Sequence, residues 1–145
     1  MPINLDFFRI EFLDFYQPNS RACALHFKIE PDHDGKKFLD VFFTDEFMED
    51  FFSLPDVARK KVEKIFEHNR KLFLQWGLIK IEEMLNRRSF KKRIVVSSEN
   101  DLQWAKNVKE GRYIFSSKPL EENVFQFFHD PLLPERKIIG FQPNK

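Results

Sequence analysis

The stretch that decides the fold is residues 21–43, which read RACALHFKIEPDHDGKKFLDVFF. Apolar and polar side chains alternate in its first half, and the apolar parity consists of Cys23, Leu25, Phe27 and Ile29. Alternation with a period of two predicts a strand with one buried face. The Asp34-Gly35 pair then predicts a tight turn, because both central positions of the favoured hairpin turn need a positive φ. We therefore expect an antiparallel hairpin of strands 21–30 and 37–43.

A further strand precedes this hairpin. Residues 8–16 also approximate an alternation, and one parity consists of Phe8, Ile10, Phe12 and Asp14. Because Asp14 is the last member of this parity, the expected apolar face of the strand is interrupted at its C-terminal end. Residues 17–20, Gln-Pro-Asn-Ser, form a turn cluster before residue 21. Together the three segments predict an antiparallel three-stranded meander.

Helix signals follow the meander. Thr44 is a favourable N-cap for a short helix over residues 45–52, and acids in its first turn suit the positive end of the helix dipole. Ser53 with the proline and acid that follow predicts a second start, and residues 56–88 contain no proline. The main apolar stripe of this long helix consists of Val62, Ile65, Phe66, Phe73 and Trp76. Gly77 indicates either a kink or a break into a helix pair, and the sequence leaves both open.

The C-terminal third alternates shorter segments. The β-branched residues 92–97 predict a strand, residues 98–110 a helix with Gly111 beyond its end, and residues 112–116 another strand. A last helix is expected to begin at Ser117-Lys118-Pro119 and to end before Pro131, with an apolar face of Leu120, Val124, Phe127 and Phe128. Residues 136–141 predict a final strand.

These elements predict an α+β fold in one globular domain, residues 1–145. The expected architecture is an N-terminal antiparallel three-stranded meander packed on a long helix or helix pair, followed by further short strands and two shorter helices. The composition is unusual in phenylalanine, with 19 residues of 145, and 42% of the chain is hydrophobic. Because so much apolar surface can be buried, the composition excludes a disordered chain.

Composition also bears on location. No apolar run is long enough for a transmembrane helix, and the first residues lack the basic and apolar regions of a signal peptide. The single cysteine, Cys23, cannot form an intramolecular disulfide and suits a reducing compartment. We therefore expect a cytoplasmic protein with no membrane association.

Charge is distributed in blocks although the net charge is only +1. Residues 1–58 hold 12 acidic and 5 basic side chains, residues 59–93 hold 4 acidic and 12 basic, and residues 94–145 hold 7 of each. Such a distribution is typical of a nucleic-acid face or of a steered partner site. It is equally consistent with an acidic sheet and a basic helix that neutralise each other, which is the interpretation we favour.

No motif predicts catalysis, a metal or a cofactor. Cys23 and His26 are three residues apart on a strand and therefore point to opposite faces, which argues against a Cys–His nucleophile. The hairpin turn already accounts for Asp32 and Asp34, and no second cluster at a conventional ligand spacing accompanies them. With four glycines and no Gly-rich phosphate loop, nucleotide binding through close backbone approach is disfavoured. An enzyme is accordingly less favoured than a binding protein.

The leading functional hypothesis is a domain that acts by binding a protein, including a second copy of itself. Three phenylalanines on the short helix, Phe47, Phe51 and Phe52, are the candidate contact residues. A short helix with three aromatic side chains either closes over a sheet or presents an apolar patch to a partner.

Two alternatives come from other classes. The first is a nucleic-acid-binding accessory protein that uses the basic run Arg87, Arg88, Lys91, Lys92 and Arg93, with Phe90 among them, because lysine and arginine contact phosphates and aromatic rings stack on bases. The second is a small-molecule-binding protein or enzyme with a pocket between sheet and helix, which a concave pocket with convergent polar groups would favour.

Residues 22–98 resemble a small bacterial family described only as a domain of unknown function. The residues that match its pattern are Ala22-Cys23, Gly35, Leu39 to Phe43, Phe66 to Arg70 and Val95-Val96-Ser97-Ser98. The resemblance implies a compact bacterial α+β domain. It supplies neither an activity nor site residues.

Overall fold

A computed structural model describes residues 8–19, 21–53, 59–85, 93–113 and 117–127, and every structural statement below concerns these residues. Their elements are, in chain order, β1 (Arg9–Asn19), β2 (Ala22–His33), β3 (Lys36–Thr44), α1 (Asp45–Phe52), α2 (Arg59–His68), α3 (Arg70–Leu85), β4 (Arg93–Val96), α4 (Ser98–Lys109), β5 (Ser117–Glu121) and β6 (Val124–Phe127). The balance of helix and strand confirms the α+β class.

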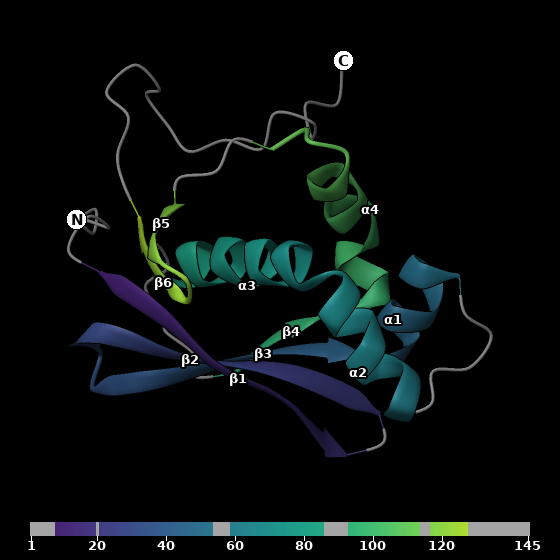
Figure 1. The fold of residues 1–145 in the computed structure, drawn as a ribbon, viewed down its shortest axis with the longest axis horizontal. Helices are drawn as coiled ribbons and strands as arrows, with labels where there is room; N and C mark the ends of the chain where they lie inside the picture. The colour runs from purple at the N-terminus through teal and green to yellow at the C-terminus, as the bar shows by residue number, and fades with distance from the viewer. Residues whose placement is uncertain (1–7, 20, 54–58, 86–92, 114–116, 128–145) are drawn as a thin grey trace.

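The strands form one sheet in the order β4-β3-β2-β1-β6-β5 (Figure 1). Neighbouring strands are antiparallel except β3 and β4, which are parallel and are connected through α1, α2 and α3. The meander β1-β2-β3 is confirmed. At its second turn Asp34 and Gly35 both have a positive φ, 54° and 74°, as the Asp-Gly pair predicts.

A β-bulge changes the face of β1 that is buried. Phe12 pairs with Phe27, but the next partner of β2 is Asp14, so Leu13 is an extra residue in the ladder. Beyond the bulge Phe15 turns to the core and stacks on Phe66 at 4.3 Å between ring centroids. Asp14 has the same sequence parity as Phe8, Ile10 and Phe12, which are buried. The bulge shifts this parity by one residue, so Asp14 lies on the outer face beside His26 and is exposed.

The first helix matches its predicted bounds. In α1 the Thr44 hydroxyl accepts a hydrogen bond from the Phe47 amide at 3.1 Å, which confirms the N-cap. Ser53 ends α1 with a positive φ of 56°. The predicted second start also involves residues 54–56, which lie outside the described part of the chain.

The long predicted helix is a helix pair, and the break lies at Asn69 rather than at Gly77. The Asn69 side chain donates to the Ile65 carbonyl oxygen at 2.9 Å, an alternative to helix continuation that asparagine favours. Gly77 lies inside α3, where a Cβ atom would come within 2.9 Å of Phe27 Cζ. Glycine at this position lets α3 cross closely over the sheet.

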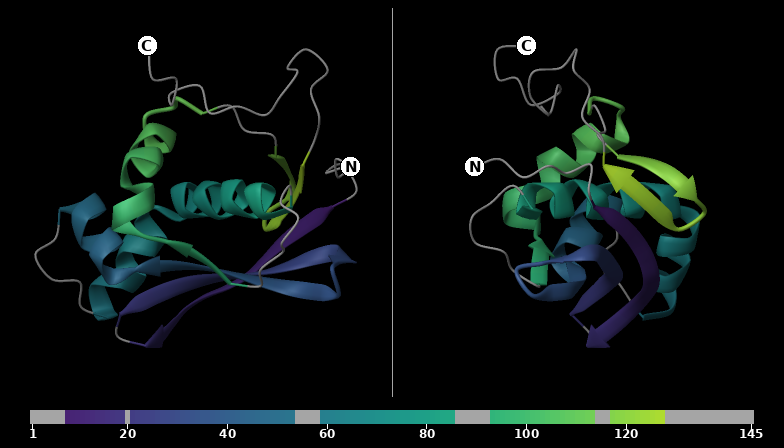
Figure 2. Two further views of the ribbon diagram at one scale, coloured as in Figure 1. Left: turned by 180° about the vertical axis from the view of Figure 1, so that it is seen from behind. Right: turned by 90° about the vertical axis from the view of Figure 1, so that its left-hand side faces the viewer.

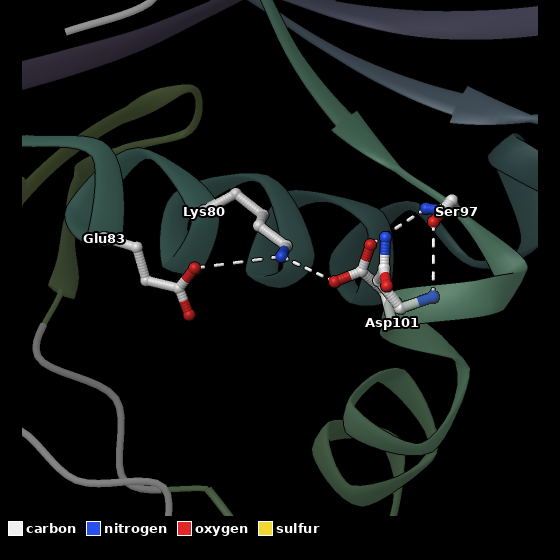
Figure 3. A network of polar contacts seen from close by, with 5 residues as sticks. Lys80, Glu83, Ser97 and Asp101 are labelled. Carbon is white, nitrogen blue, oxygen red and sulfur yellow. Dashed lines mark hydrogen bonds and ion pairs between the residues drawn. The ribbon is translucent and has the colours of Figure 1, made fainter. Parts of the chain in front are cut away.

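A polar network joins α4 to α3 (Figure 3). The Lys80 amine lies 2.6 Å from Asp101 and 3.7 Å from Glu83. Asp101 also accepts a hydrogen bond from the Ser97 amide at 2.9 Å, while the Ser97 side chain caps the helix at Asn100. The carboxylate of Asp101 therefore fixes both the start of α4 and its contact with α3.

The last predicted helix is wrong. Residues 117–127 form the β5–β6 hairpin, and β6 pairs with β1 through Ile10 and Phe125. This long-range pairing overrides local helix signals, and it buries Phe127 in the core. Arg112 and Tyr113 do not belong to a strand, contrary to the expectation for 112–116. The strand expected at 136–141 lies outside the described residues.

Helices and core lie on one side of the meander (Figures 1 and 2). The sheet curls so that β6 and β5 rise beside α3, as the right-hand view of Figure 2 shows. Nowhere in the described part of the chain is a helix both long and apolar enough to cross a membrane.

Candidate binding surface

The two faces of the sheet have different surroundings. The inner parity of β2 and β3 is buried beneath the helices and includes Leu25, Phe27 and Phe43, all fully inaccessible to solvent. No described helix or strand covers the opposite face of β1 to β4 (Figures 1 and 2). Two large apolar side chains are exposed there, Phe38 at 37% and Val95 at 55%.

Strand register arranges this outer face into rows. An apolar row crosses the four strands from β4 to β1 and consists of Val95, Phe42, Ala24 and Tyr16. Because Ala24 is small, the rings of Tyr16 and Phe42 meet edge to face across it, with centroids 6.5 Å apart. Cross-strand contacts of this kind stabilise the sheet. They leave Ala24 and Phe42 buried and Tyr16 half-buried, so Val95 is the exposed apolar side chain of this row.

A charged row lies beside the apolar row and consists of Arg93, Asp40, His26 and Asp14. His26 Nδ1 lies 2.6 Å from Asp40 Oδ1. The imidazole also stacks on Phe38, with centroids 5.4 Å apart and rings inclined by only 14°. The half-buried His26 is therefore held by a carboxylate and an aromatic ring at once.

Tyr16 is linked to the same carboxylate. Burial raises the pKa of the Tyr16 phenol, and the negative charge of Asp40 and a hydrogen bond to it raise the pKa further, while Arg93 acts in the opposite direction. The phenol therefore remains protonated at neutral pH and acts as a hydrogen-bond donor. Tyr16, His26 and Asp40 form a satisfied polar group within the outer face.

Arg93 is the one residue of the predicted nucleic-acid segment that lies in the described chain. Its side chain is exposed and its guanidinium lies 4.7 Å from the centre of the Phe42 ring. The other predicted residues, Arg87, Arg88, Lys91 and Lys92, belong to residues 86–92, outside the described part. The end of the basic run is thus placed at the edge of the outer face.

The three phenylalanines of α1 lie elsewhere. Phe47 is fully buried and contacts Trp76 edge to face at 5.4 Å. Phe51 and Phe52 are half-buried, and Phe51 also packs on Trp76, at 4.8 Å. Phe47 therefore belongs to the core, because α1 closes over the end of α3, and a partner could reach only the remaining exposed parts of Phe51 and Phe52.

The other titratable groups are placed as strand parity predicts. Cys23 faces the core, and burial raises the pKa of its thiol to about 12, whereas His26 lies on the outer face. Within the described ranges, no group of three or more histidine, cysteine or acidic side chains is placed to hold a metal ion.

Sequence reasoning missed the outer face as a site. The signal was present, because Phe38 and Phe42 occupy the parity of residues 37–43 that is opposite to the buried Leu39, Val41 and Phe43. Aromatic residues on both parities of a strand indicate either two covered faces or one exposed aromatic face.

Comparison with known proteins gives no match to this chain, whether among family models, curated proteins or solved structures.

Proposed function

We propose that this domain acts through protein–protein contacts made by the outer face of its sheet, and that its partner is a second copy of the chain. The observation that supports the proposal is a pair of exposed apolar side chains, Val95 and Phe38, beside a charged row on a face that no described element covers. Protein interfaces combine apolar contacts of this kind with polar and charged groups.

The charges of this face favour a protein over a nucleic acid. Asp14 and Asp40 lie in the same row as Arg93, and Glu11 and Lys28 form a further cross-strand pair on β1 and β2. Nucleic-acid binding depends on neutralising phosphates with an excess of cations. Alternating charges instead allow complementary pairing with another mixed surface.

The order of charges in the row favours a second copy. Arg93 lies at the β4 end of the charged row and Asp14 at the β1 end, with Asp40 and His26 between them. A two-fold axis parallel to the strands places β4 of one copy over β1 of the other. In that arrangement Arg93 faces Asp14 and Asp40 faces His26 across an isologous interface.

The test is the molar mass of the full chain, measured by size-exclusion chromatography with light scattering over a range of concentrations. We expect the mass to rise from monomer to dimer with concentration, and Val95→Lys to shift this transition to higher concentration. Leu120→Lys is the matched control, since Leu120 is similarly exposed, at 43%, but lies on β5 at the opposite edge of the sheet. A monomer at every concentration would contradict the proposal, as would equal effects of the two substitutions.

A second measurement tests the nucleic-acid alternative. Binding of a fluorescent single-stranded oligonucleotide is measured by anisotropy over a range of salt concentrations. We expect no saturable binding at physiological salt. Tight binding that weakens steeply with salt and is lost in Arg93→Glu would instead favour the nucleic-acid alternative.

A further inference from the structure

A cavity of about 360 Å³ lies between α3 and the β5–β6 hairpin. Four of the side chains that line it are apolar, namely Leu74 and Leu78 from α3 and Pro119 and Phe125 from the hairpin. Leu74 and Leu78 are buried, so they form an apolar wall of the cavity. The volume is at the small end of the range of ligand sites, about 300–1,000 Å³.

Cationic groups lie at one part of this cavity. Arg70 and Lys71 begin α3 and both line the cavity, where Glu122 at the hairpin turn is the single acid among the described lining residues. Glu122 is exposed, whereas Arg70 is half-buried. Charge near the apolar wall is therefore positive on balance.

Arg70 is held in place without a carboxylate. It donates a hydrogen bond to Asn123 Oδ1 in the hairpin turn, and its guanidinium lies 4.9 Å from the centre of the Phe12 ring and 5.7 Å from that of Phe66. No acidic side chain of the described chain lies within 4.0 Å of its nitrogens. A guanidinium that is fixed but not neutralised is well suited to bind a carboxylate or phosphate.

We infer that the cavity binds a small amphiphilic anion, with its head group at Arg70 and Lys71 and its apolar tail against Leu74, Leu78 and Phe125. The shared chemistry of the ligand is a carboxylate or phosphate joined to a short hydrocarbon chain. This site is separate from the outer face of the sheet and does not depend on the proposed self-association.

The first experiment is isothermal titration of the full chain with four probes of equal chain length: octanoate, octyl phosphate, octylammonium and octanol. Both anions are expected to bind saturably, and octylammonium is expected to bind at least about tenfold more weakly, because a charge-assisted hydrogen bond is replaced by repulsion. The stronger of the two anions identifies the head group. Equal binding of anion and cation, or no saturable binding of either anion, would overturn the inference.

Variants place the ligand in this cavity. Arg70→Gln is expected to weaken both anions about tenfold or more while leaving octanol unchanged. Since Arg70 also packs on Phe12 and Phe66, a second variant is needed that leaves those contacts intact. Gln75→Trp fills the cavity from a half-buried lining position and is expected to abolish binding of all probes.

Matched controls lie outside the cavity. Gln103→Trp, on α4, should leave octanoate binding unchanged, and Val95→Lys should do so as well because it alters only the outer face. Unchanged binding in Gln75→Trp, or an equal loss in Gln103→Trp, would show that the anions bind elsewhere and would overturn the inference.

Discussion

The inner and outer faces of β2 and β3 are made by alternate residues of the same two strands, yet they have different roles. Inner residues such as Leu25 and Phe43 are fully buried under α1 and α3. Outer residues such as His26 and Phe38 lie on a face that no described element covers. The comparison shows that phenylalanine content alone does not define the core of this protein. Parity along each strand decides which face an aromatic ring lies on, and its neighbours decide whether it is exposed there, since Phe42 on the outer face is buried whereas Phe38 is not.

The largest expected difference between the faces is in stability. Phe43→Ala should lower the free energy of unfolding by about 3–5 kcal/mol, because it opens a cavity among Phe47, Phe73 and Trp76. Phe38→Ala on the same strand should cost less than about 1.5 kcal/mol, since its ring is already partly exposed. Urea denaturation at a low protein concentration measures both, and similar losses would contradict the distinction between the faces.

The inner face should also be sensitive to high pH through Cys23. Burial raises the pKa of the thiol from its ordinary value of 9.0 to about 12, so the folded state disfavours the thiolate. The stabilising contribution is complete below about pH 9 and is lost as the pH rises toward about 12. At about pH 10 the loss amounts to about 1 kcal/mol relative to neutral pH.

The measurement is urea denaturation of the wild type and Cys23→Ala at about pH 8 and about pH 10. The wild type should lose more stability between the two pH values than the variant does, whatever the cost of the substitution itself. The ionisation of Tyr16 and Tyr113 affects both proteins alike. An equal loss in both would show that the thiol is accessible to water.

The smallest expected effect concerns how closely α3 approaches the inner face. Gly77→Ala should raise helix propensity by about 1 kcal/mol, but its Cβ would lie 2.9 Å from Phe27 Cζ and 3.2 Å from Leu25 Cδ1. Overpacking in a filled core costs about 1–3 kcal/mol, so the net result should be a loss of about 1 kcal/mol. Thermal unfolding checks the sign, and a stabilised variant would mean that the ring of Phe27 can move aside.

Much of the fold could be predicted because its signals are local. The alternation in residues 21–30, the Asp34-Gly35 turn and the Thr44 cap each act within a few residues, and each is confirmed. Strand β4 and helix α4 are also predicted by signals within a few residues, and both are confirmed.

The predictions that were wrong or incomplete concern segments whose structure is determined by contacts between residues distant in the sequence. The pairing of Phe125 with Ile10 turns an expected helix into the β5–β6 hairpin, and the close approach of Phe27 explains Gly77 without a break in the helix. The bulge at Leu13 likewise depends on pairing with β2. Phe38 and Phe42 on the second parity of residues 37–43 could have indicated an aromatic outer face, but local sequence does not show which face of a sheet the helices leave uncovered.

The most direct test of self-association through the outer face is sedimentation equilibrium of four proteins: the wild type, Arg93→Asp, Asp14→Arg and the double variant. Each single reversal should weaken dimerisation, because like charges then meet across the two-fold axis, and the double variant should restore it toward the wild type. A monomeric wild type would contradict the account. So would a double variant whose dimerisation is weakened by as much as the two single substitutions weaken it together.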